Sequence, residues 1–221
     1  MGFFERRREK KAEAAHAAAL SAWQAADDSL RRFLSDLAAG PSVDVPGFLF
    51  KKGEAATIDY QGAVLVEPRR QQGHYTGGYS GFSFKVTTGV RYHVGGTRGT
   101  YQPGPEVATV IDQGDVTMTN QRVVFRGPKQ TREWAFTKLV GWHHDDPHPI
   151  TYLQVSNRQK TSGFGYSAEH APLVRFRFAW AMALYSEQVD HLRQSLETEL
   201  QEHQASRPQP LGLPPPPPPP A

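Results

Sequence analysis

The sequence predicts an α+β protein in which an antiparallel sheet or small barrel lies between two helices. Three observations support this prediction. The N-terminal stretch is rich in Ala and lacks internal Gly and Pro, the middle contains short alternating segments separated by turn residues, and the C-terminal part has apolar residues stepped by threes and fours. We therefore divide the chain into an N-terminal helix over residues 1–40, a domain over 41–205 and a disordered proline-rich tail over 206–221.

Composition limits the classes of function. The chain has 221 residues with a net charge of +3 and no cysteine, which excludes disulfide scaffolds, cysteine-bound zinc and thiol catalysis. No run of 18 apolar residues is present, and no apolar run follows the N-terminal charges. The expectation is a soluble, cytoplasmic protein that uses no cofactor.

The first predicted element is a helix over residues 3–39, ended by Gly40-Pro41. Its apolar residues form a narrow seam that Asp27 interrupts: Leu20, Trp23, Leu30, Leu34 and Leu37. A narrow seam is typical of a helix that packs on another helix. The partner is either the C-terminal helix of the same chain or a second copy, so self-association through the terminal helices is one expectation.

The start of this helix combines Phe3 and Phe4 with five cations, which are Arg6, Arg7, Arg8, Lys10 and Lys11. A basic amphipathic segment of this kind can lie on an anionic membrane surface, so these cations are candidate anion or lipid contacts. In the alternative interpretation they are solvated and pair with glutamates spaced four residues away.

Residues 41–104 are predicted to hold a linker, the first strands and a glycine-rich ribbon. Residues 48–50 and 64–66 are short apolar pieces, the second ended by Pro68. The ribbon over 73–104 alternates apolar and polar residues on both sides of Thr88-Gly89, which predicts a hairpin. Its glycines lack the spacing of a phosphate-binding loop. Its aromatic and basic residues resemble a small base-stacking surface, although aromatics are common on ribbons and nucleic acid is not the expected partner: Tyr75, Tyr79, Tyr92, Tyr101, Arg91 and Arg98.

Gly114–Trp142 is the best-patterned stretch and predicts short strands joined by tight turns. Strands are expected around 116–119, 123–125 and 134–136, with a further run from 139. Asn120-Gln121 predicts the first turn, because Asn tolerates the left-handed conformation, and 127–130 predicts the second.

These residues carry a family resemblance. Gly114, Thr119-Asn120, Arg122, Phe125 and the run 134–139 resemble the core motif of bacterial PH-like and GRAM-like domains. The resemblance covers about residues 113–200 and implies a PH-like antiparallel β-barrel closed at one end by a C-terminal helix. Relatives include lipid-headgroup binders, protein-binding modules and many with no known role. Arg122 is either a packed or paired strand residue or a phosphate contact. Lipid-binding members pair Lys and Arg around the first hairpin, which Lys51-Lys52 and Arg69-Arg70 roughly match.

A histidine- and aspartate-rich segment follows the meander. His143, His144, Asp146 and His148 are residue types that ligate zinc and similar ions. Neighbouring residues of an extended strand face opposite sides, however, and two prolines bend the chain there. The competing interpretation is a polar loop between strands.

The C-terminal part predicts strands over 150–155 and 174–178, because Val174, Phe176 and Phe178 alternate with two arginines. A closing helix is predicted to begin near Ala179. The tail ends in seven prolines over 214–220, which favour polyproline II. Such a tail is either a ligand for an aromatic-lined groove or a solvated end.

No motif of a known enzyme class is present, since both G-x-S-x-G and H-E-x-x-H are missing. The sequence therefore favours a non-catalytic PH-like interaction module that acts as a protein-binding adaptor, with an unidentified protein partner. The alternative is peripheral binding to anionic membrane lipid through the basic helix start and the barrel.

Overall fold

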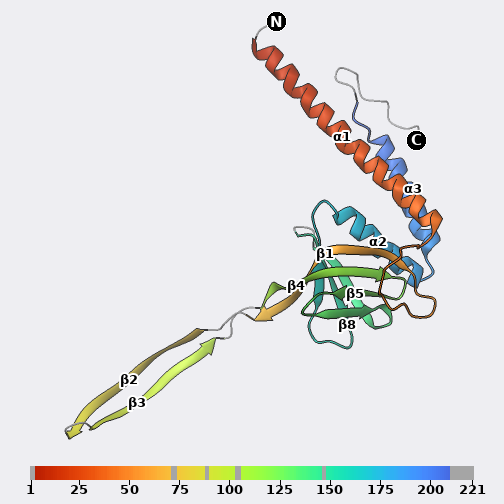
Figure 1. Ribbon diagram of the computed structural model, residues 1–221. Helices are drawn as coiled ribbons and strands as arrows, with labels where there is room; N and C mark the ends of the chain where they lie inside the picture. Colours follow the sequence, from red (N-terminus) through yellow and green to blue (C-terminus); the bar gives the residue numbers. More distant parts are fainter. Residues whose placement is uncertain (1–2, 71–73, 88–89, 103–105, 146–147, 210–221) are drawn as a thin grey trace, which may run out of the picture.

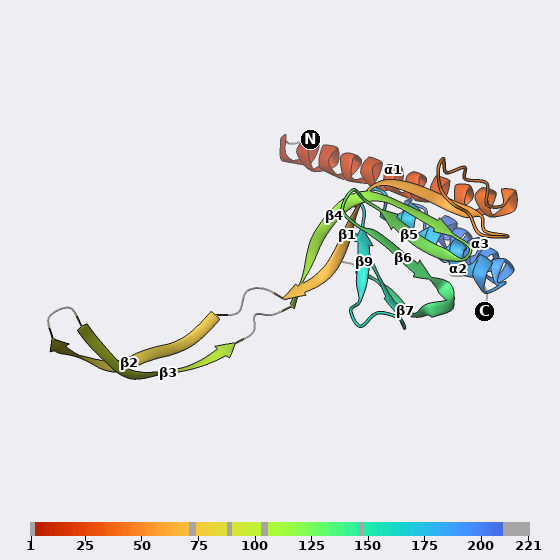
Figure 2. The ribbon, with the colours of Figure 1, turned by 60° about the horizontal axis from the view of Figure 1, so that its bottom comes forward.

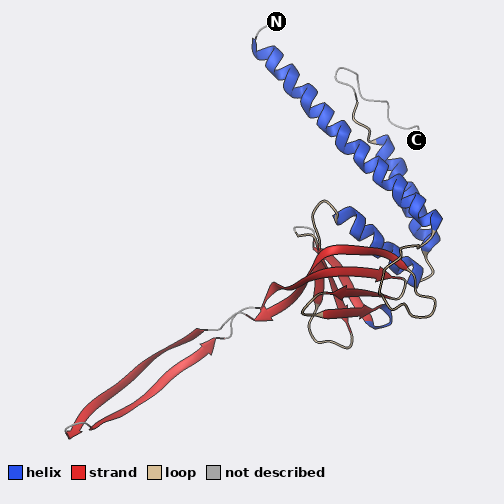
Figure 3. Cartoon of the chain, viewed as in Figure 1, coloured by secondary structure: helices blue, strands red, loops and turns tan. Residues whose placement is uncertain are grey.

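The computed structural model describes residues 3–70, 74–87, 90–102, 106–145 and 148–209, and shows an α+β architecture (Figures 1 and 3). The helices are α1 (Phe3–Ala39), η1 (Phe136–Lys138), α2 (Ala171–Tyr185) and α3 (Val189–Ala205). The strands are β1 (Ala56–Arg70), β2 (His74–Thr87), β3 (Val90–Gln102), β4 (Glu106–Thr119), β5 (Arg122–Arg126), β6 (Thr131–Ala135), β7 (Leu139–Asp145), β8 (Ile150–Val155) and β9 (Ser162–Gly165). The predicted long N-terminal helix, the central meander and the strand at 150–155 are confirmed.

Seven strands form one antiparallel sheet in the order β6-β5-β4-β1-β9-β8-β7. The long strand β1 is central, since it pairs with β4 from Ala56↔Thr119 to Arg70↔Glu106 and with β9 on its other side. In the described part of the chain β6 and β7 are the two edges, so the hydrogen-bonded sheet is open. Four pairings in this sheet join consecutive strands, so the connections between them are short: β4–β5, β5–β6, β7–β8 and β8–β9.

The ribbon forms a separate two-stranded sheet, β2–β3, with pairs from His74↔Gln102 to Thr87↔Val90. The predicted hairpin is thus confirmed. It lies apart from the seven-stranded sheet, beyond the ends of β1 and β4, in both views (Figures 1 and 2). The side chains of the ribbon, including its tyrosines, lie outside what the structure describes.

Two predictions for the segment before the sheet are wrong. Residues 48–50 form no strand but a loop, in which the rings of Phe48 and Phe50 meet edge to face. Pro68 does not end β1, which continues to Arg70. Proline is tolerated there because β1 pairs past Val66 with β4 alone among the described strands, which leaves one side open for the nitrogen that lacks a proton.

The meander residues fill the core of the sheet. Trp134, Phe125 and Val116 are fully buried. On β6 Trp134 lies between more exposed neighbours, as a strand with one buried face requires. On β4 and β5 both faces are covered, since Thr117 and Val124 are buried as well. Gly114 is a steric requirement, because a Cβ there would overlap the backbone carbonyl of Arg126 on the neighbouring strand. Asn120 lies in the predicted turn but not in the left-handed conformation: Glu187 is the one described non-glycine residue with positive φ.

The predicted strand over 174–178 is wrong, since these residues belong to helix α2. Pro172 occupies the first turn of this helix, a position that suits its fixed φ. Val174 and Phe178, four residues apart, pack on the sheet, whereas Phe176 and Trp180 pack against the terminal helices. The helix is buried on two faces, and the overlap of two helical stripes produces the alternation that resembles a strand.

The predicted closing helix is divided in two. Glu187 adopts φ 58° between α2 and α3, and the N–H of Gln188 donates to the carbonyl of Ala183 at 2.8 Å. This left-handed residue ends α2 in the manner of a helix C-cap and turns the chain into α3.

Helices α1 and α3 lie antiparallel, side by side, beyond the sheet (Figures 1 and 2). Leu30, Phe33 and Leu37 of α1 are buried with Leu196 of α3 and the outer face of α2. The intramolecular pairing of the terminal helices is therefore confirmed. No helix in the described ranges is long and apolar enough to cross a bilayer.

Candidate functional site: a groove between the terminal helices

The charged cluster of the sheet is built around Arg122, the candidate phosphate contact. Its guanidinium donates to both carboxylate oxygens of Glu54, at 2.8 and 3.1 Å, to Glu133 at 3.0 Å and to the carbonyl of Leu49 at 2.8 Å. Its side chain is 11% exposed and that of Glu54 is fully buried. Phe48 covers the guanidinium at 5.2 Å. Arg122 is thus a paired structural residue, and its donors are directed at groups of its own chain.

The ionisation of Glu54 reflects the same geometry. Burial raises the pKa of Glu54, but hydrogen bonds from Arg122, from the backbone N–H of Lys51 and from Thr119 outweigh burial and hold this pKa below its ordinary value. The cluster therefore stays ionised and neutralised by internal pairing at neutral pH.

Thr119 and Asn120, which precede Arg122 in the motif, make hydrogen bonds that support this cluster. The side-chain carbonyl of Asn120 accepts from the N–H of Ala55 at 2.9 Å, and its amide donates to the carbonyl of Gly53 at 3.0 Å. Thr119 accepts from the N–H of Arg122 at 3.0 Å. The motif residues fasten the β4–β5 turn to the loop that precedes β1.

The candidate lipid contacts are not brought together. Lys51 pairs with Glu133 at 3.0 Å and Lys52 is exposed on the loop before β1, whereas Arg69 and Arg70 are exposed at the far end of that long strand. The remaining candidates lie at the start of α1, where Arg7, Lys10 and Lys11 are exposed; the side chains of Arg6 and Arg8 are outside the description. This end of α1 extends away from the sheet in Figure 1. The described basic residues of the sheet and of the helix start therefore do not form one basic surface.

The histidine segment is split between different surroundings. His143 stacks on Tyr152 at 5.0 Å, whereas His144 accepts or donates a hydrogen bond with Thr151 at 2.9 Å and packs edge to face on Phe178. His148 lies 3.2 Å from Asp145. Asp146 lies outside the described residues, and among the described ones no group of three His, Asp or Glu side chains is placed to hold a metal ion.

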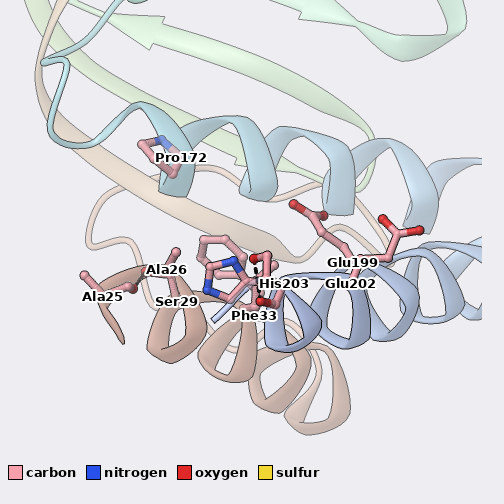
Figure 4. Close-up of a pocket in the computed structure, with 10 residues that line it drawn as sticks. Ala25, Ala26, Ser29, Phe33, Pro172, Glu199, Glu202 and His203 are labelled. Carbon is pink, nitrogen blue, oxygen red and sulfur yellow. Dashed lines mark hydrogen bonds between the residues drawn. The ribbon is translucent and has the colours of Figure 1, made fainter. Parts of the chain in front are cut away.

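A concave surface lies where α1, α3 and the start of α2 meet (Figure 4). It has a volume of about 620 Å³, within the range typical of ligand pockets. We call it the terminal-helix groove and define it by the residues that line it: Ala25, Ala26, Ser29, Leu30, Phe33, Pro172, Glu199, Glu202, His203 and Ser206. Its floor is apolar and its rim on α3 carries two exposed carboxylates, Glu199 and Glu202.

The end of the groove is fixed by a reciprocal contact between α1 and α3. The indole N–H of Trp23 donates to the carbonyl of His203 at 2.9 Å, the imidazole Nε2 of His203 lies 2.9 Å from the carbonyl of Trp23, and the two rings stack at 5.1 Å. The contact with the carbonyl of Trp23 requires that Nε2 carries the proton. These two hydrogen bonds, each between a side-chain ring and a backbone carbonyl, set the register of the two helices.

Asp27 continues this contact between the two helices. It is 9% exposed, accepts from Arg31 at 2.6 Å and lies 3.4 Å from the amide of Gln204 on α3. The hydrogen bond from Arg31 holds the pKa of Asp27 below its ordinary value. Asp27 does separate the buried apolar residues that begin at Leu30 from Trp23, but its carboxylate is satisfied within the helix interface.

The opposite wall is fixed by α2. Phe33 stacks on Phe176 at 4.1 Å, and Arg177 donates to Asp36 of α1 at 2.6 Å while its guanidinium lies over the ring of Trp180. In Figure 4, Glu199 and Glu202 stand on the side of α3 that faces the helix bearing Pro172. The helices that line the groove are thus held together by specific contacts, and the groove has polar groups along one side.

Comparison of the chain with protein-family models, with curated proteins and with solved structures finds no match in any of the three.

Sequence reasoning did not identify the terminal-helix groove. It placed Leu20–Leu37 in a helix seam but assigned no role to Ala25, Ser29, Glu199 or Glu202. The available signal was the segregation of charge, since the helical C-terminal part carries an acidic excess whereas the start of α1 is basic. The place of Pro172 in the groove could not be predicted, because the residues after it were assigned to a strand.

Proposed function

We propose that this protein is a non-catalytic PH-like interaction module that acts as a protein-binding adaptor, and that the terminal-helix groove is its docking surface. The observation that carries the proposal is the combination of an apolar floor, Ala25 to Phe33, with an exposed acidic rim, Glu199 and Glu202. An apolar core bounded by a polar rim is the usual anatomy of a protein interface. The complementary ligand is a polypeptide segment that carries apolar and basic side chains.

The PH-like assignment is supported by the order of elements. All seven strands of the main sheet are antiparallel, the first strand is central and pairs on both sides, and helix α2 packs its Val174 and Phe178 on the buried face directly after the last strand. This arrangement agrees with the strand-rich core and C-terminal helix that the sequence resemblance implies. The adaptor role also agrees with the Arg122 cluster, whose cations are neutralised by Glu54 and Glu133 and leave little free charge for an anionic ligand.

A second candidate function is peripheral binding to anionic membrane lipid, confined to the start of α1. The supporting observation is the exposure of Arg7, Lys10 and Lys11 on a helix end that extends away from the sheet. Binding of this kind weakens with salt, because exposed charges are screened over about 10 Å at 0.1 M ionic strength.

Site-specific photo-cross-linking tests the docking surface. A photo-reactive phenylalanine derivative replaces Ala25, which lines the groove, or Gln24, its exposed neighbour about 100° around the helix. We expect irradiation of the full chain in cells to give polypeptide adducts from Ala25 and few from Gln24. The adducts from Ala25 should decrease when Glu199 and Glu202 are replaced by Lys. Equal yields at both positions, or adducts that are insensitive to these substitutions, would contradict the proposal.

A further inference from the structure

Beyond the end of α3, helix α1 has a long face that the described parts of the chain do not cover. The last residues of α3 lie beside Trp23, and α1 continues from there to Phe3. Figure 1 shows this half of α1 extending past the other helices. In proteins most of the stability of a helix comes from the packing of one of its faces, so a partner that covers this face stabilises α1.

The uncovered face is continuous with the terminal-helix groove. Positions at spacings of three or four residues fall on one side of a helix. One such stripe runs from the start of α1 into the groove: Phe4, Arg7, Lys11, Ala15, Ala18, Ala22, Ala25 and Ser29. Its members from Ala15 to Ala25 are exposed alanines, whose small side chains let a second helix approach closely, and its last two members line the groove. Its first members are basic or aromatic.

We infer that this stripe pairs antiparallel with the same stripe of a second copy, so that the basic start of α1 from one copy lies in the groove of the other. This inference rests on the proposed function of the groove and names its occupant. Ala15 of one copy then lies opposite Ala18 of the other, and Arg7 lies beside Ala25 and Ala26, which line the groove. Two-fold symmetry makes both contacts occur twice.

Charge complementarity selects this occupant. The cations Arg7 and Lys11 reach the rim formed by Glu199 and Glu202, which is exposed and on which these two carboxylates lie one helical turn apart. The same segment cannot enter its own groove, because α1 is one continuous helix and its rise of 1.5 Å per residue places Phe4 about 37 Å from Ser29. The occupant therefore comes from another molecule.

The first test is the mass of the full chain in solution. Sedimentation velocity should give twice the chain mass of 24.6 kDa at micromolar concentration. Ala18→Arg places a cation from each copy close to the symmetry axis, so we expect the dissociation constant to rise at least about tenfold. Ala17→Arg is the matched control, since Ala17 is equally exposed but lies about 100° around the helix, and it should leave the dimer intact. A monomeric full chain, or equal effects of the two substitutions, would overturn the inference.

A charge exchange tests the occupant. R7E together with K11E, or E199K together with E202K, should each weaken the dimer, and the chain that carries all four substitutions should regain it. Glu197→Lys, on the side of α3 away from the groove, is the control and should have little effect. Failure of the fourfold variant to regain the dimer would overturn the register. All these positions are exposed, and circular dichroism checks that each variant is folded.

Two further experiments distinguish failure of this inference from failure of the proposed function. The Ala25 cross-linker should join residues 1–11 of a second copy. Adducts with another protein, or with residues 210–221 of the same chain, would overturn the inference, although adducts with another protein would leave the adaptor proposal standing. A third outcome would make the membrane the partner and overturn the inference. In that case the protein co-sediments with phosphatidylserine vesicles, R7E with K11E abolishes this binding, and the same substitutions leave the mass in solution unchanged.

Discussion

The sheet and the helical layer use charged residues in opposite ways. In the sheet, Arg122 and Glu54 are nearly or fully buried and each is bonded to a partner within the same module. In the helical layer, Glu199 and Glu202 are exposed beside an apolar surface. A charge that is buried and paired stabilises one backbone arrangement, whereas an exposed charge at the edge of an apolar groove is available for recognition. The comparison assigns a structural role to the first region and the proposed docking role to the second.

The largest effect that this comparison predicts is the loss of Arg122. Arg122→Ala leaves the buried carboxylate of Glu54 without its cation, and breaking a buried pair in this way costs about 3–5 kcal/mol of the free energy of unfolding. Urea unfolding followed by tryptophan fluorescence measures the change. The control is Arg132→Ala, which removes a solvent-accessible pair with Glu67, whose side chains are 26% and 23% exposed, and should cost about 1 kcal/mol. Similar losses of stability for the two substitutions would show that the Arg122 pair has no special structural role.

The second prediction concerns acid. The pKa of Glu54 lies below its ordinary value despite burial, which acts to raise it, and backbone N–H groups of Lys129 and Gln130 likewise outweigh burial at Asp112 and lower its pKa. A carboxyl whose pKa is lowered by folding stabilises the folded state above its ordinary pKa of about 4, and this contribution is lost as the pH falls through the folded-state pKa.

The urea midpoint should therefore fall between pH 5 and pH 2, and it should fall less steeply in Arg122→Ala, which lacks the main partner of Glu54. A midpoint that rises on acidification, or the same pH dependence in both proteins, would contradict the assignment of the low pKa to this pair.

The sheet was more predictable than the helical layer, for a physical reason. Strand alternation over 116–126 is a local pattern, and the turns at Asn120-Gln121 and Gly127–Gln130 carry their own residue signals, so neighbouring strands could be placed from short windows of sequence. The role of Asn120 was still misjudged, because its side chain bonds the backbone of residues 53 and 55, far away in the sequence.

The errors in the helical part arise from tertiary contacts. Residues 174–178 resemble a strand because α2 buries two faces, a fact that depends on α1 and α3 packing on one side and the sheet on the other. The bonded state of Asp27 could not be predicted because Gln204, one of its partners, lies 177 residues away. The groove joins α1 to α3 and Pro172, so no window of sequence contains it. The one sign of the groove in the sequence is the difference in charge between the basic start of α1 and the acidic C-terminal part.

The smallest predicted effect on stability sharpens the comparison most. Glu199→Lys with Glu202→Lys alters two exposed side chains that have no part in the helix seam, so the free energy of unfolding of the monomer should change by less than about 0.5 kcal/mol for each substitution. The same variant should lose the groove adducts of Ala25, whereas Arg132→Ala, which alters a pair on the sheet, should retain them. Urea unfolding of the purified variants at low protein concentration is compared with the cross-linking yield of the same variants in cells. A variant that loses stability along with binding would show that these carboxylates support the fold, and the separation of structure from recognition would then not hold.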